Sequence, residues 1–293
     1  MGLAGPRGGA WQVCLDRRRA RHKLNQLSEP RYENAARNTH NVVADWVFAQ
    51  TDIHSVLDIP CGKGAFVQRC LDRRLTVCAA DCEDLCEIAG AEFRTANMNE
   101  RLPFDDDALD AVVCIDGIEH IERPFDFIPE CRRVVRQDGA IVVTTPNISS
   151  LRSRWRWLLT GFHNKCKTPL DEENPNPLHH INMLSFAKLR YLLHRNGFEI
   201  EEVKTNRCKL INCIYAPLYP LTYWMTKRVF NKEEKDPQQR KRNTEILKQL
   251  QSKPILFGET RIVMARNRRT KHQSARRSAA AIHGKAAVQS DAA

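Results

Sequence analysis

The stretch V-L-D-I-P-C-G-K-G at residues 56–64 decides the fold, because it joins an apolar run to a helix through a glycine-rich turn. Residues 55–59 predict a strand, and residues 66–74 have the spacing of a helix. When a strand turns sharply into a helix, its backbone can lie against a bound nucleotide only if side chains stay out of the way. Gly62 and Gly64 meet this need. A glycine-rich loop alone is a weak signal, since unrelated nucleotide-binding proteins use similar ones.

Strands and helices alternate on both sides of this stretch. A helix at 124–136 should end at Gln137-Asp138-Gly139, with Gly139 in the left-handed conformation. A second helix, 185–198, has Ser185 placed as its N-cap and Gly197 as its stop. The pattern predicts an α/β fold with a doubly wound, seven-stranded, mostly parallel sheet buried on both faces. Its further strands are expected at 76–81, 92–96, 108–116, 140–146, 199–205 and 258–266.

Composition divides the chain into one large domain and two basic ends. The chain is 42% hydrophobic and carries a formal net charge of +11. Residues 1–40 and 267–293 together supply ten of these eleven charges, so the balanced centre does not suit a nucleic-acid surface. We expect a flexible basic segment at 1–30, a domain at 31–266 and a basic disordered tail at 267–293. Insertions follow the fifth and sixth strands at 148–180 and 207–256.

Further motifs follow at regular separations. Asp81 ends the second strand, where an acidic side chain can accept both hydroxyls of a ribose. The later motifs are A-N-M-N-E-R-L-P-F-D-D-D-A-L-D-A-V-V-C (96–114), I-D-G-I-E-H-I-E (115–122) and C-R-R-V-V-R-Q-D-G-A-I-V-V-T-T-P-N (131–147). With residues 56–64, they resemble the class I S-adenosylmethionine-dependent methyltransferases, in the branch that includes ubiquinone and menaquinone biosynthesis enzymes. The resemblance covers residues 35–205 and the last strand. It departs at Pro60, where the family usually has Gly, and at Asn97, where it often has Asp.

This resemblance implies a Rossmann-like methyltransferase fold, S-adenosyl-L-methionine as cofactor and methyltransferase activity (EC 2.1.1.-). The Asn97 side-chain oxygen could still accept a hydrogen bond from the adenine amino group. Asp58, surrounded by apolar residues, is expected to order the loop backbone. The positions carried over as cofactor-binding are Asp58, Cys61, Gly62, Gly64, Asp81, Cys82, Asn97, Met98 and Asp116.

Catalytic residues are less evident, because the cofactor carries the difficult chemistry and a base is needed only if the acceptor loses a proton. The candidates are His120 and His180. The alternative is structural: Glu119 and His120 could cap or pack a helix opening, and His180 could lie on the surface. Metal ligands are not expected, because the four-residue spacing of Cys78, Cys82 and Cys86 does not match zinc sites.

The two insertions indicate which kind of molecule accepts the methyl group. Arginines and tryptophans alternate in S-L-R-S-R-W-R-W-L-L-T-G-F (150–162), and residues 210–230 are apolar and aromatic before Lys227 and Arg228. This suits an oily acceptor or a membrane interface, although a lid or dimer contact is the alternative. We expect a small-molecule or lipid-linked acceptor methylated at oxygen or carbon, and a cytoplasmic protein with peripheral membrane contact through 210–230.

Two other functions stay open. One is a catalytically silent, cofactor-binding scaffold subunit. The other is RNA methylation aided by the basic ends. Nucleic acid is the less favoured partner, because no Asn-Pro-Pro-Tyr or Asp-Pro-Pro-Tyr follows the fourth strand.

Overall fold

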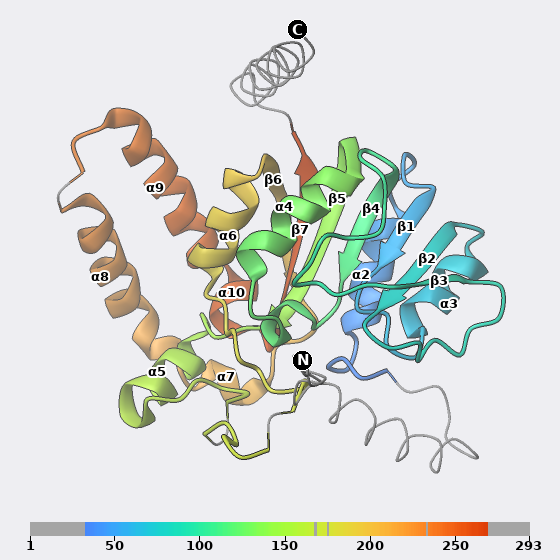
Figure 1. The fold of residues 1–293 in the computed structure, drawn as a ribbon. Helices are drawn as coiled ribbons and strands as arrows, with labels where there is room; N and C mark the ends of the chain where they lie inside the picture. The colour runs from blue at the N-terminus through green and yellow to red at the C-terminus, as the bar shows by residue number, and fades with distance from the viewer. Residues whose placement is uncertain (1–32, 167–168, 175, 233, 269–293) are drawn as a thin grey trace, which may run out of the picture.

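A seven-stranded sheet with helices on both faces forms the centre of the protein (Figure 1). The computed structural model describes residues 33–166, 169–174, 176–232 and 234–268. The predicted segment 1–30 and all but the first two residues of the predicted tail 267–293 lie outside these ranges. The strands are β1 (Ser55–Asp58), β2 (Thr76–Asp81), β3 (Glu92–Thr95), β4 (Leu109–Cys114), β5 (Val135–Pro146), β6 (Phe198–Thr205) and β7 (Thr260–Asn267).

The strand order is β3-β2-β1-β4-β5-β7-β6. Neighbouring strands are parallel from β3 to β5, whereas β7 runs antiparallel to both β5 and β6. The predicted doubly wound, mostly parallel sheet is therefore confirmed. Because β1, β2 and β4 are adjacent and parallel, their carboxyl ends meet at one edge, where ligands bind in folds of this kind.

Two hydrophobic layers cover the sheet, and the two-residue period of a strand assigns its side chains to them alternately. Val56 packs in the layer under α2 and α3, and its neighbour Leu57 in the layer under α4 and α6. All eight residues of β7 are buried, because this strand lies between two others with helices on each side. These four helices are α2 (Thr39–Phe48), α3 (Ala65–Asp72), α4 (Pro124–Val134) and α6 (Phe186–Arg195).

The insertions are mostly helical. α8 and α9 pack against each other at the left of Figure 1, away from the sheet. The insertion elements are α5 (Leu151–Thr160), α7 (Leu210–Cys213), η2 (Ala216–Leu218), α8 (Tyr219–Asn231), α9 (Pro237–Leu250) and α10 (Lys253–Phe257). Among the described residues, none of the helices combines the length and the apolar composition that crossing a bilayer requires.

One turn differs from the sequence-based prediction. α4 ends at Val134 and the chain becomes extended at once at Val135, so β5 begins five residues before the expected start. Asp138, not Gly139, has the positive φ of 62°. Gly139 is needed for another reason, because a Cβ there would lie 2.6 Å from the carbonyl oxygen of Asp110. The prediction for the second helix is confirmed: the Ser185 side chain accepts from the Lys188 amide, and Gly197 has a φ of 85°.

Candidate active site

The loop between β1 and α3 places backbone that no side chain covers at the carboxyl edge of the sheet. Gly62 and Gly64 have φ values of 51° and 85°, which favour glycine. A Cβ on Gly64 would lie 2.4 Å from the Ile88 side chain, so this glycine permits close packing. A Cβ on Gly62 would meet only the Asn34 side chain, at 3.9 Å, so its backbone faces open space. The turn is entered through a cis Ile59–Pro60 peptide.

Asp81 ties the end of β2 to this loop. Its Oδ2 accepts from the Gly62 amide at 3.0 Å, and its Oδ1 accepts from the Cys82 amide at 2.7 Å. Each carboxylate oxygen has a second lone pair that a ligand hydroxyl can use. Asp58 is only 2% exposed, and burial, with a further effect from Asp81, raises its pKa well above the usual range. Cys61 is buried, and burial likewise raises the pKa of its thiol, so it is unsuited to act as a nucleophile.

The other predicted cofactor positions follow β3 and β4. Asn97 is exposed, and its side-chain oxygen accepts from the Asn99 amide at 3.0 Å while retaining one lone pair. Met98 is buried. Asp116 is half-buried with a φ of 46°, and its Oδ1 accepts from the Thr144 hydroxyl at 2.6 Å. Because β1, β2 and β4 are neighbours, the loops that carry these residues open at the same sheet edge.

His120 and His180, which are 60 residues apart in the sequence, meet beside this edge. Their ring centroids are 4.8 Å apart and their planes lie at 71°. The insertion after β5 brings His180 back, because the Asn182 amide donates to the carbonyl of Glu119 at 2.9 Å. His120 Nδ1 lies 3.1 Å from the carbonyl oxygen of His179. The structure thus brings the two predicted catalytic residues together.

Burial sets the charge of this pair. Burial, followed by the effect of His120, lowers the pKa of His180 to about 4, and burial also lowers the pKa of His120. Both imidazoles are therefore neutral at pH 7. The side chain of Glu119 is fully buried, and burial together with Asp116 raises its pKa to about 8. A base with a pKa near 4 is weak, so at neutral pH His180 is better suited to binding through its lone pair than to removing protons.

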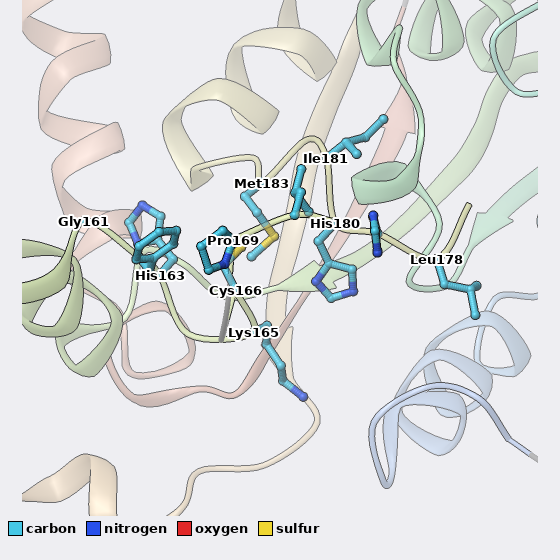
Figure 2. A pocket seen from close by; sticks show the side chains of 12 residues that line it. Gly161, His163, Lys165, Cys166, Pro169, Leu178, His180, Ile181 and Met183 are labelled. Carbon is cyan, nitrogen blue, oxygen red and sulfur yellow. The ribbon is translucent and has the colours of Figure 1, made fainter. Parts of the chain in front are cut away.

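A cavity of about 440 Å³ opens beside His180. Figure 2 shows the side chains that line it, including Lys165, Cys166 and Met183 from the segment between β5 and α6. The other side chains that line the cavity are both polar and apolar. An acceptor molecule in this cavity would lie next to the histidine pair.

Two residues near the pair are not in the predicted set. Glu119 stands between Ile118 and His120, with Ile115 and Ile121 close by in the sequence, and this placement was a usable signal for a buried carboxyl group. Arg261 lies on β7 and is fully buried, and burial lowers the pKa of its guanidinium to about 10. Nothing in the local sequence points to Arg261, because only the long-range pairing of β7 with β5 brings it here.

Comparison with known proteins supports the fold and its class. Residues 57–143 match the family model described as a methyltransferase domain. This match supports the class predicted from the sequence. A probable S-adenosylmethionine-dependent methyltransferase from Mycolicibacterium smegmatis is 30% identical over 176 residues, which cover 58% of this chain and 62% of that protein. One from Mycobacterium tuberculosis is 31% identical over 121 residues, 39% of this chain and 44% of its own length.

The chain thus spans less than two thirds of the length of these relatives. Among solved structures, a SAM-dependent methyltransferase from Archaeoglobus fulgidus aligns with a TM-score of 0.46 and 21% identity, covering 78% of this chain and 94% of that one. The class predicted from the sequence and its cofactor, S-adenosylmethionine, are confirmed at the level of the family. The ubiquinone and menaquinone branch, the cofactor-binding positions and the two catalytic histidines stay predictions.

Proposed function

We propose that this protein transfers a methyl group from S-adenosylmethionine to a hydroxyl oxygen or a carbon of a small-molecule or lipid-linked acceptor. The observation that carries the proposal is the adjacency of two features at one sheet edge. The open backbone of Gly62 lies beside the Asp81 carboxylate. His180, which contacts His120, lines a cavity large enough for an acceptor.

On the cofactor side, the residues present fit a nucleoside with an amino-acid tail. Asp81 offers free lone pairs to two ribose hydroxyls, and Asn97 offers one to the adenine amino group. Gly62 leaves room for the tail, because no side chain fills the space above its backbone. The bound cofactor supplies an activated methyl group, and the protein contributes orientation and proximity, worth up to about 7–11 kcal/mol of the barrier.

On the acceptor side, neutral imidazoles can accept a hydrogen bond from an acceptor hydroxyl and hold its oxygen in line with the methyl group. The carbonyl of His179 fixes the His120 ring, because a carbonyl only accepts and Nδ1 must therefore carry the proton. His120 Nε2 is left with its lone pair.

An oily or lipid-linked acceptor is favoured by the exposed apolar side chains of residues 210–230. Leu210 is 89% exposed and Trp224 is 57% exposed, although both are large and apolar. Lys227 and Arg228 lie over the rings of Tyr223 and Trp224, at 6.0 and 5.5 Å. Aromatic and basic groups mixed in this way suit the headgroup region of a membrane.

Transfer of a tritiated methyl group into fractions of a cell lysate tests the reaction. We expect label in material that organic solvent extracts, or in small molecules, and none with Gly62→Val, whose side chain would fill the cofactor space. Label in RNA would establish the competing nucleic-acid function. Absence of label in every fraction, together with normal binding of S-adenosylhomocysteine, would establish a silent scaffold.

Flotation with anionic vesicles tests the membrane contact. We expect the protein to float at low salt and less at high salt, because each basic group near the surface contributes about 1 kcal/mol of screened attraction. Replacing Tyr223 and Trp224 with Ser should reduce flotation. Tyr191→Ser is the matched control, because Tyr191 is 54% exposed on α6, outside the segment. No flotation at low salt would leave residues 210–230 as a lid or dimer contact.

A further inference from the structure

Three side chains with metal-binding atoms converge beside the acceptor cavity. One donor atom each from Glu119, His120 and His180 lies within 4.8 Å of the other two. Glu119 and His120 are consecutive in a short 3-10 turn, η1 (Ile118–His120), and His180 comes from the insertion after β5. Among the described residues, no cysteine takes part in such a group.

The buried carboxyl group of Glu119 is a second, independent observation that points to a ligand at this cluster. Its side chain is 0% exposed. Burial raises its pKa, and the Thr145 hydroxyl and the Glu119 amide lie close enough to lower it in part, but neither forms a hydrogen bond of good geometry with its oxygens. Burial without a charged partner holds this carboxyl group protonated, as its raised pKa shows, and coordination of a metal ion would displace the proton.

The positive charge of Arg261 does not satisfy this carboxyl group. Arg261 is fully buried and attracts Glu119, but no ion pair within 4.0 Å joins the two among the described contacts. The guanidinium donates to the carbonyl of Leu184 at 3.2 Å, while its Nε and Nη1 have no partner. Arg261 therefore leaves the lone pairs of Glu119 unoccupied.

The histidines are arranged as metal ligands usually are. A ligating histidine commonly donates its second ring N–H to a carbonyl or carboxylate, which fixes the tautomer and the ring direction. His120 does this through Nδ1, at 3.1 Å from the carbonyl oxygen of His179. His180 keeps a buried Nδ1 that has no hydrogen-bond partner.

The size of the cluster fits a transition-metal ion after a small contraction. Donors about 2.0–2.1 Å from a tetrahedral zinc ion are roughly 3.4 Å apart. The donor atoms here lie within 4.8 Å of one another, and rotation of the side chains can close the difference. Two imidazoles and one carboxylate suit zinc and cobalt better than magnesium or calcium, which prefer oxygen ligands.

We propose that Glu119, His120 and His180 bind one divalent transition-metal ion of the zinc type. Three protein ligands with a fourth position left open is the pattern of catalytic zinc sites. His180 lines the cavity, so the open position faces the space proposed for the acceptor. Resting on the proposed function, the ion would hold an oxygen atom of the acceptor in place of a direct hydrogen bond to the ligating imidazole nitrogens. The metal site itself does not depend on that function.

Binding of Co²⁺ to the untagged, chelator-treated full chain tests the site without any activity assay. We expect one ion per chain, with the visible absorption of a four- or five-coordinate Co²⁺ ion that Zn²⁺ displaces. Loss of even an outer-shell group usually costs about 10–100-fold in metal affinity. Glu119→Gln and His180→Ala should therefore each weaken binding by about 100-fold or more. Zn²⁺ should raise the melting temperature of the wild type and not that of the variants.

Two control variants make the result decisive. His163→Ala removes a histidine that lines the same cavity but is outside the cluster, and it should leave Co²⁺ affinity unchanged. Cys82→Ser removes an exposed thiol and should also have no effect. Loss of binding in Cys82→Ser but not in Glu119→Gln would overturn the proposal, as would absence of saturable binding to a folded wild type. Metal binding without methyl transfer would leave this site standing and refute only the proposed function.

Discussion

Replacing Asp81 with Ala should weaken binding of S-adenosylhomocysteine while the domain stays folded. In the wild type, the Asp81 oxygens accept from the Gly62 and Cys82 amides at 3.0 and 2.7 Å, and their remaining lone pairs are proposed to accept from the two ribose hydroxyls. Alanine removes these acceptors and frees the loop amide that Asp81 holds. A hydrogen bond to a charged group contributes about 1.5–3 kcal/mol. A loss of this size makes the dissociation constant about 10- to 150-fold larger.

Isothermal titration calorimetry measures this change, and two further variants define its cause. Asp81→Asn keeps one acceptor oxygen, so its affinity should lie between those of the wild type and Asp81→Ala. Asp84→Ala removes an exposed carboxylate three residues later and should bind normally. An unchanged affinity in Asp81→Ala, with a normal unfolding transition, would show that this carboxylate does not contact the cofactor and that the ribose lies elsewhere.

Three further predictions concern the glycines and the ion pairs. Gly64→Ala should lower the free energy of unfolding, measured by urea denaturation, more than Gly62→Ala does. An alanine at either position carries left-handed strain of about 1–2 kcal/mol, but only at Gly64 would the Cβ overlap a side chain, at 2.4 Å. Equal losses in the two variants would contradict this reasoning. Gly62→Val should remain folded and lose calorimetric binding of S-adenosylhomocysteine, and normal binding would mean that the loop is not the cofactor site. Arg207 and Lys209 lower the pKa of the Glu259 carboxylate to about 2, despite its partial burial. The unfolded carboxyl group titrates near 4.3, so the stability that this pairing adds is present above that pH and is lost as the pH falls through about 2. Glu259→Gln should thus be less stable than the wild type at pH 7, and a difference that does not shrink toward pH 2 would refute the pairing.

The sequence determined the order of strands and helices and the glycine-rich loop after β1, because these depend on local patterns. Strand β2 has the predicted bounds of residues 76–81. The two-residue period of a strand and the need for glycine at a tight turn are both set by neighbours in the chain. The end of α4 was predicted less well: this helix ends at Val134, and Gly139 lies within β5, where the carbonyl oxygen of Asp110, 29 residues away, leaves no room for a Cβ.

Only the tertiary structure decided how the acceptor side is built. His120 and His180 could each be named from the sequence, but their contact depends on the Asn182–Glu119 hydrogen bond that draws the insertion back across the sheet edge. The burial of Glu119 and its closeness to Arg261 depend on β7, which enters the sheet from the far end of the chain. Local periodicity carries no information about such pairings, since they form only when distant segments close a long loop and bury a common core.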